Sequence, residues 1–237
     1  MPTAPSPVTT AQGAVWRIGH RPGPPISPAN RFAHPWRCAT FAKAMPKACK
    51  SNDKYCKSNE QDKRTHDMKQ TDIARLGQEN AIEMIGKEWM LVTAGSADHF
   101  NTMTASWGGL GFLWNKPVAF VFVRPERYTH DFIEANDRLT LAFLGEEGRD
   151  ALKYCGSHSG RDADKMAATG LTPLTVADDA VTFAQARLTL VCRKLYKDAM
   201  RAEAFIDKAC LERWYNDQPG GGLQDVYVVE IEAVYER

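Results

Sequence analysis

Short apolar runs separated by turn-forming residues dominate the chain from residue 68 onward and predict a mainly β fold. Residues 89–93 and 100–107 flank a four-residue turn and are expected to pair as a hairpin. Further strands are expected at residues 118–123, 138–144, 184–194 and 225–235. About seven strands with few, short helices favour a closed or nearly closed antiparallel β-barrel with Greek-key-like connections.

The strand predicted at 184–194 alternates most regularly. We expect one face to carry Ala186, Leu188, Leu190 and Cys192, and the other to carry Gln185, Arg187, Thr189, Val191 and Arg193. Helical patterns are weaker, and short helices are expected at residues 71–85, 128–136, 148–155, 159–170 and 205–215. Residues 219–222, PGGG, are expected to form a loop.

Composition divides the chain into a leader, residues 1–67, and a body, residues 68–237. The leader has 11 Lys and Arg against 4 Asp and Glu, whereas the body has 19 against 25. Nine of the 13 prolines lie in the first 46 residues. Because the leader shows no sustained hydrophobic period, we expect it to be disordered or to be a gene-start extension preceding Met68.

Three sharper functions for the leader stay open. It is rich in Arg and has no acidic residue before Asp53, as in an organelle transit peptide. Its cysteines could bind zinc with His34, although their spacing matches no standard zinc knuckle. Its basic charge could also attract nucleic acid without sequence preference.

Several classes of function are disfavoured for the body. It has three cysteines without regular spacing, which fits a reducing, cytoplasmic compartment better than a disulfide framework. No run of 18 apolar residues predicts a membrane span, and no secretory signal precedes the body. Dinucleotide-binding, P-loop and zinc motifs are missing from the sequence, so no separate nucleotide domain or structural zinc site is expected.

Candidate ligand-binding residues lie at both ends of the strand predicted at 118–123. Before it, the polar residues Asn101, Thr102, Thr104 and Ser106 alternate with Met103, Ala105 and Trp107, and a glycine-rich turn follows at 108–111. After it, Arg124 and Arg127 precede a predicted helix that Thr129 could cap. Paired guanidiniums beside a helix start suit a phosphate. The alternatives are an edge strand with a wet face, and a surface pair neutralised by Glu126 and Asp131.

A third cluster, residues 155–165, holds Ser and Gly donors together with Arg161 and Lys165. Anion binding and a solvated loop would both explain this composition. Three groups in these regions could act in catalysis, namely His99, His158 and Cys155. None has an identifiable partner in the sequence, so we favour a bystander role for each and predict no catalytic side chain.

Taken together, three segments resemble the flavin reductase-like proteins with an FMN-binding split barrel, and most closely their flavoredoxin-type branch. They are NTMTASWGGLGFLWNKPVAFVFVRPERYTHDFI at 101–133, YCGSHSGRDADKMAATGLT at 154–172 and ARLTLVCRKLY at 186–196. The resemblance covers residues 87–235, and the leader has no counterpart in it.

The resemblance implies a homodimer of split barrels with FMN near the interface and NADH or NADPH as electron donor. It implies these FMN-binding residues: Asn101, Thr102, Met103, Thr104, Ala105, Ser106, Trp107, Arg124, Arg127, Tyr128, Thr129, Cys155, Gly156, Ser157, Ser159, Gly160 and Lys165. Residues 101–107 would run along the isoalloxazine ring and ribityl chain, and Arg124, Arg127 and Thr129 would hold the phosphate. Backbone amides of 103–107 are candidates for stabilising reduced flavin.

The expected function is therefore an NAD(P)H-dependent flavin reductase. An electron carrier that keeps FMN and serves a redox protein partner is the alternative, and a non-redox module for another phosphorylated ligand is a third. Neither a membrane nor a specific nucleic acid is expected as a partner.

Overall fold

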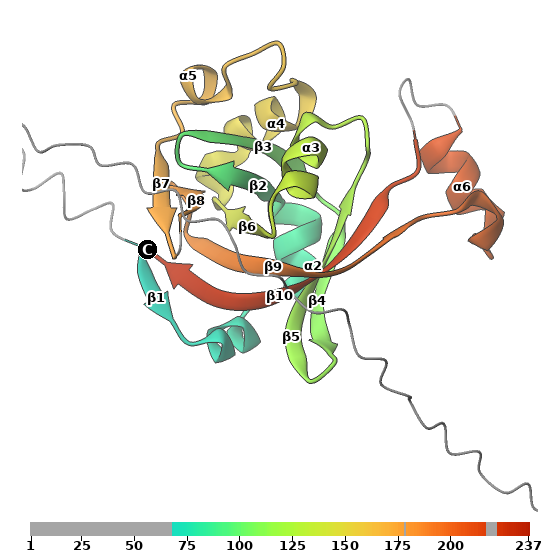
Figure 1. The fold of residues 1–237 in the computed structure, drawn as a ribbon, viewed down its shortest axis with the longest axis horizontal. Helices are drawn as coiled ribbons and strands as arrows, with labels where there is room; N and C mark the ends of the chain where they lie inside the picture. Colours follow the sequence, from blue (N-terminus) through green and yellow to red (C-terminus); the bar gives the residue numbers. More distant parts are fainter. Residues whose placement is uncertain (1–67, 178, 217–221) are drawn as a thin grey trace, which may run out of the picture. The chain divides into compact units, whose positions relative to one another are not determined.

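The structure is a computed structural model that describes residues 68–177, 179–216 and 222–237. The predictions for the leader 1–67, and for all but the last residue of the loop at 219–222, lie outside these ranges. Ten strands are described within them (Figure 1). They are β1 (Lys69–Thr71), β2 (Met90–Ser96), β3 (His99–Ala105), β4 (Gly108–Leu113), β5 (Lys116–Val123), β6 (Arg138–Phe143), β7 (Pro173–Val176), β8 (Ala180–Phe183), β9 (Leu188–Ala199) and β10 (Asp225–Glu236).

The main sheet has eight strands and is antiparallel throughout. Its order is β3-β2-β6-β9-β10-β5-β4, with β1 paired to β10, while β7 and β8 form a separate hairpin. The mainly β, antiparallel fold predicted from the sequence is confirmed. Strands β3 and β4 stand at the two ends of the sheet order, although only residues 106 and 107 separate them along the chain.

Two hairpins frame the region of interest. The first confirms the pairing predicted for 89–107, because Ser96 on β2 lies opposite His99 on β3. The second joins β4 to β5 through Trp114 and Asn115, which both have positive φ, at 51° and 59°. The glycine-rich segment at 108–111, predicted as a turn, is therefore an edge strand.

Core side chains pack on both faces of the central strands. One cluster fills the barrel and includes Val92, Leu141 and Leu190. A second lies between the outer face of the sheet and the covering helices and includes Leu152 and Phe183. The prediction of one polar face on the strand at 184–194 is wrong, since β9 is buried from Leu188 through Cys192. The strand also begins at Leu188, four residues later than predicted.

Helical segments are short and cover one side of the sheet (Figure 1). The α-helices are α2 (Ala81–Glu83), α3 (Tyr128–Ala135), α4 (Arg149–Ser157), α5 (Lys165–Thr169) and α6 (Lys208–Tyr215). Single turns of other helix types are η2 (Ile73–Gln78), η3 (Met84–Glu88), η4 (Glu146–Gly148) and η5 (Ala202–Ala204). The helices expected at 128–136, 148–155, 159–170 and 205–215 are confirmed within a few residues at their ends, and 71–85 forms several turns instead of one helix.

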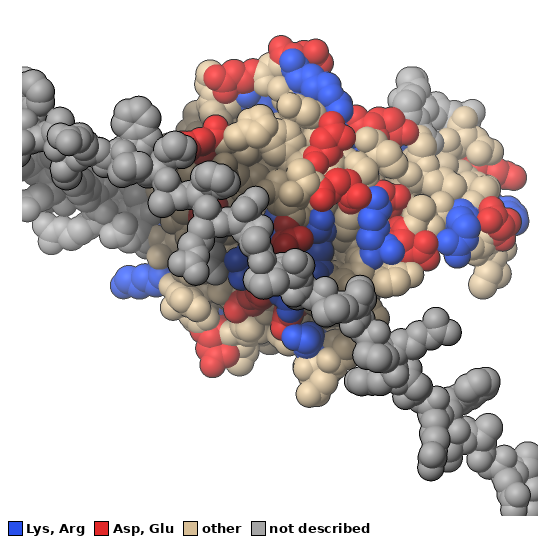
Figure 2. Space-filling view, viewed as in Figure 1, with Lys and Arg blue, Asp and Glu red and all other residues tan. Residues whose placement is uncertain are grey.

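Helices α4 and α5 lie beside β2 and β3, whereas α6 stands at the far end of the long β9–β10 ribbon (Figure 1). On the face shown in Figure 2, acidic and basic side chains are interspersed. Among the described helices, none has the length and apolar character needed to cross a membrane.

Candidate functional site

A cavity of about 180 Å³ opens where the end of β3 faces the end of β5, and we call it the β3–β5 cavity. Its lining is Met103, Thr104, Ala105, Ser106, Trp107, Phe122, Arg124, Arg127 and Gln224. Seven of these nine residues belong to the set that the sequence predicted for FMN. Two stretches 17 or more residues apart therefore meet in one place because the barrel curls β3 toward β5.

Two arginines give this cavity a positive charge. The Arg127 guanidinium donates to the carbonyls of Gly156 at 2.7 Å and Cys155 at 3.2 Å. Arg124 donates to the Trp214 carbonyl at 3.2 Å. Burial lowers the pKa of Arg127, and the nearby charge of Arg124 lowers it further. Both effects disfavour the cation, so an anion placed between the two side chains would relieve them.

Carboxylates do not neutralise this pair in the described part of the chain. Asp131 pairs with Arg161 at 2.7 Å, and the Glu126 carboxylate accepts from the Gly222 amide at 3.0 Å. The interpretation of Arg124 and Arg127 as a surface pair satisfied by Glu126 and Asp131 is therefore wrong. The two guanidiniums retain their charge-pairing capacity toward the cavity.

A second cavity, of about 250 Å³, lies between β3 and the start of α5, and we call it the β3–α5 cavity. It takes four other predicted residues, Asn101, Thr102, Gly160 and Lys165. Gly160 fits closely here, because a Cβ atom at this position would lie 2.1 Å from Asn101 Oδ1. The predicted site residues are thus divided between two cavities along one strand.

Lys165 is buried, with only 5% of its surface exposed. Its Nζ donates to the Thr102 carbonyl at 2.6 Å and to the Cys155 carbonyl at 3.4 Å. Burial lowers the pKa of this amine, and burial also raises the pKa of the neighbouring Cys155 thiol. The lysine therefore ties α5 to β3 and to the end of α4.

The threonine hydroxyls expected to face a ligand are engaged within the protein. Thr102 accepts from Thr93 at 2.8 Å, and Thr104 donates to the Leu152 carbonyl at 2.5 Å. Thr129 does not cap α3, whose N-cap is Arg127, and its hydroxyl accepts from Asn101 Nδ2 at 2.8 Å. These bonds fix β3 against its neighbours and leave its outer backbone edge, at the end of the sheet, for a ligand.

The remaining predicted residues support the two cavities from behind or lie at turns. Cys155 and Gly156 hold Arg127 through their carbonyls. Ser157 donates to the Lys153 carbonyl, and Ser159 accepts from the Arg161 amide, so both hydroxyls serve local turns. The Tyr128 ring lies under the Arg161 guanidinium, 4.5 Å from its centroid.

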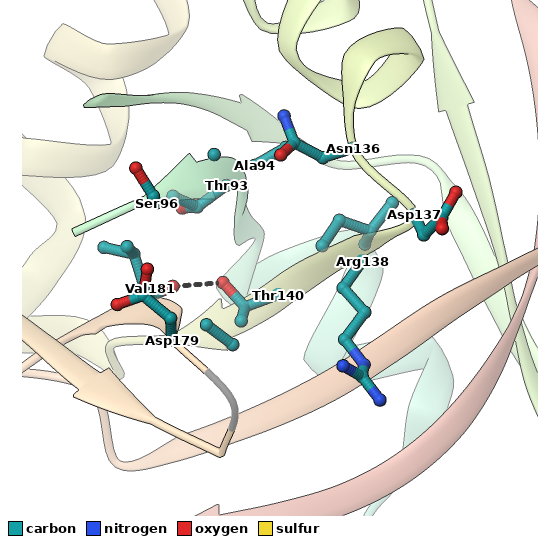
Figure 3. A pocket seen from close by; sticks show the side chains of 12 residues that line it. Thr93, Ala94, Ser96, Asn136, Asp137, Arg138, Thr140, Asp179 and Val181 are labelled. Carbon is teal, nitrogen blue, oxygen red and sulfur yellow. Dashed lines mark hydrogen bonds between the residues drawn. The ribbon is translucent and has the colours of Figure 1, made fainter. Parts of the chain in front are cut away.

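Sequence reasoning missed Phe122 and Gln224 in the β3–β5 cavity. Phe122 could have been found from strand alternation, since it lies two residues before Arg124 and shares its face of β5. Gln224 immediately precedes β10, in a segment without a recognisable pattern. A further cavity of about 220 Å³ lies near β2 and β6 (Figure 3). There the Thr140 hydroxyl is bonded to the Val181 carbonyl, and Arg138 runs away from both toward Glu232.

Sequence comparison decides the family of this arrangement. The model of the flavin reductase like domain matches residues 84–237, which is more than half of the chain. The protein belongs to the flavin reductase-like family. The family predicted from the three sequence segments is thereby confirmed. No curated protein sequence matches the chain significantly.

Solved structures show the same fold as this family member. An FMN-binding domain of a flavin reductase-like enzyme from Shewanella baltica OS155 aligns with a TM-score of 0.51 and 17% identity, covering 72% of this chain and 78% of that chain. Flavoredoxin from Methanosarcina acetivorans aligns with 0.48 and 22%, covering 63% and 68%. The NADH:FAD oxidoreductase SgcE6 from Streptomyces globisporus, with NAD and FAD fragments, aligns with 0.46 and 15%, covering 63% and 74%.

Proposed function

We propose that this protein binds FMN in the β3–β5 cavity and passes electrons from NADH or NADPH to the flavin. One observation carries the proposal. Arg124 and Arg127 flank a cavity beside the free edge of β3, and neither has a carboxylate partner among the described residues. A phosphate is the anion that paired guanidiniums bind best, and family membership supports a flavin as the molecule that carries it.

The residues present fit the cofactor. Trp107 and Phe122 provide apolar surface for a flat ring, and the edge of β3 can offer amide donors to polar atoms of that ring. The cavity volume of about 180 Å³ is below the range of roughly 300–1,000 Å³ that is common for ligand pockets. We therefore expect part of the bound molecule to extend beyond this subunit's own walls.

Bound flavin would supply the hydride-accepting chemistry, with a proton taken from solvent. The chain's contribution is binding and electrostatics. Arg124 and Arg127 hold the phosphate, while the edge of β3 orients the ring. This division needs no acid or base from the protein.

The absorption spectrum of the purified protein tests the proposal. We expect the flavin bands after FMN is added, bleaching of those bands with NADH or NADPH, and recovery in air. FMN that stays bound but is not reduced by either nucleotide would favour the electron-carrier alternative. A protein that gives no spectral or fluorescence change on titration with FMN would refute flavin binding itself.

We further propose that the protein is a homodimer that uses the β4–β5 hairpin as its contact surface. Phe112 is 71% exposed and Trp114 is 56% exposed, and the Trp114 ring lies 6.2 Å from Tyr196. A tryptophan in the left-handed conformation is unfavourable in an isolated turn, where Asn or Gly is usual. A second copy that covers these rings would explain both features.

Combining Phe112→Ser with Trp114→Gly is expected to convert the dimer to a monomer. Glycine suits the positive φ of the turn, so the hairpin should persist while the apolar contact is lost. Light scattering coupled to gel filtration measures the mass. Ile82→Ser removes an equally exposed apolar residue elsewhere and should leave the dimer intact. A variant that stays dimeric, or a monomeric wild-type protein, would contradict this surface.

A further inference from the structure

Helix α6 is attached to the β3–β5 cavity. The helix has no buried residue of its own. Its last turn meets the residues that line the cavity, because the Trp214 carbonyl accepts from Arg124 at 3.2 Å and the Trp214 ring lies 5.4 Å from the Trp107 ring. The helix therefore adds little to the core, and its position is set by the wall of the cavity.

Tyr215 anchors this attachment. Its hydroxyl donates to Gln224 Oε1 at 2.8 Å, and Gln224 lines the cavity. The Arg124 guanidinium lies over the Tyr215 ring at 5.5 Å, and Phe205 packs against that ring at 5.6 Å. These contacts fix the orientation of the neighbouring residue, Trp214.

The two tryptophans form an edge-to-face pair, with an angle of 81° between the rings. Trp107 is 38% exposed and Trp214 is 43% exposed. A pair that served only to pack the helix would bury both rings. Instead, large aromatic surfaces remain open beside the cavity, where a planar ring can stack against them.

We propose that Trp214 is a specificity-determining residue that stacks against a planar conjugated ring of the second substrate. This inference rests on the proposed function, in which the first ligand of the cavity is FMN. The ring belongs either to the nicotinamide donor or to an aromatic electron acceptor such as a quinone. Both share the flat, polarisable surface that an indole recognises, and the experiment distinguishes them.

The test uses FMN-loaded protein with Trp214→Ala, with Trp214→Phe, and with Glu212→Ala as a control on an exposed position of the same helix. NADH and NADPH oxidation give the KM of the donor. Menadione and ferricyanide, after reduction of the flavin with dithionite, compare a planar acceptor with a non-planar one. We expect Trp214→Ala to raise the KM of one planar partner by about 3- to 10-fold, and Trp214→Phe to retain most of the affinity.

The rate with ferricyanide and the Kd of FMN should stay unchanged in Trp214→Ala. A raised KM for the nucleotide identifies the donor as the stacked ring, and a raised KM for menadione identifies the acceptor. Unchanged values for both, or an equal loss with ferricyanide, would overturn the role of Trp214 while the proposed function stands. A wild-type protein that binds no FMN would overturn the proposed function and this inference together.

Discussion

Replacing Arg124 by alanine is expected to weaken FMN binding by about 10- to 100-fold. The change removes one of two guanidiniums that flank the β3–β5 cavity. Hydrogen bonds to charged groups are worth about 1.5–3 kcal/mol each, and each 1.4 kcal/mol is tenfold in affinity. Arg127, which is bonded to the Gly156 and Cys155 carbonyls, would remain to hold the phosphate more weakly.

Riboflavin makes this prediction specific, because it has the same ring and ribityl chain without the phosphate. Titrations followed by flavin fluorescence should show that the wild-type protein prefers FMN to riboflavin. In Arg124→Ala that preference should shrink, with the affinity for riboflavin nearly constant. Equal losses for both ligands would place Arg124 at the ring or in the fold, and unaltered FMN affinity would refute the phosphate assignment.

Two controls separate charge from structure. Arg124→Lys keeps the positive charge but loses the two-pronged geometry, so we expect an intermediate affinity. Arg201→Ala removes an exposed arginine paired only with neighbouring acidic groups, so FMN binding should not change. Thermal unfolding of each variant checks that the helix contact of Arg124 at Trp214 has not been confused with phosphate binding.

Much of this site follows from the sequence, because its parts are local. Arg124 and Arg127 sit just after a strong apolar strand, and residues 103–107 lie on a strand that alternation identifies. Their meeting required only that the strands form a barrel. The family resemblance supplied the ligand, which spacing alone left open.

Other features depend on contacts that no local pattern reveals. The hydroxyls of Thr102 and Thr104 are engaged by β2 and α4, and these partners are distant or on other elements. Strand β4 was missed because its three glycines are poor strand formers, and pairing with β5 overrides that preference. The polar positions of β9 proved buried because α4 and the β7–β8 hairpin cover its outer side, where Thr189 bonds to Thr182.

Replacing Arg187 by methionine is expected to lower the free energy of unfolding by about 2–3 kcal/mol. Its guanidinium bonds to Glu79 at 3.1 Å and to Glu88 at 2.6 Å, and it joins the segment before β2 to the start of β9. Glu79 and Glu88 are only 14% and 15% exposed, so the variant leaves two carboxylates poorly solvated. A fully buried pair would cost about 3–5 kcal/mol, and the 33% exposure of Arg187 reduces this.

Urea unfolding followed by tryptophan fluorescence measures the change, with the m value checked for constancy. Arg201→Met is the matched control. Arg201 pairs with Asp198 at 3.2 Å, but the two side chains are 55% and 46% exposed. An exposed pair contributes little, so this variant should stay within about 0.5 kcal/mol of the wild-type protein. A loss in Arg187→Met as small as that of the control would contradict a stabilising role for the network.

The pH dependence of this difference identifies its origin. The hydrogen bond from Arg187 is the largest influence on the Glu79 carboxyl, and with the charges of Arg187 and Arg75 it lowers the pKa below the ordinary value of 4.5, against the opposing effect of burial. A carboxyl with a lowered folded-state pKa binds fewer protons in the folded protein, so its stabilisation is present above pH 4.5 and is lost as the pH falls through the folded pKa. The gap in unfolding free energy between wild type and Arg187→Met should therefore be largest near neutral pH and shrink below pH 4.5. A gap that stays constant on acidification would show that Arg187 stabilises the fold through packing of its stem and not through its charge.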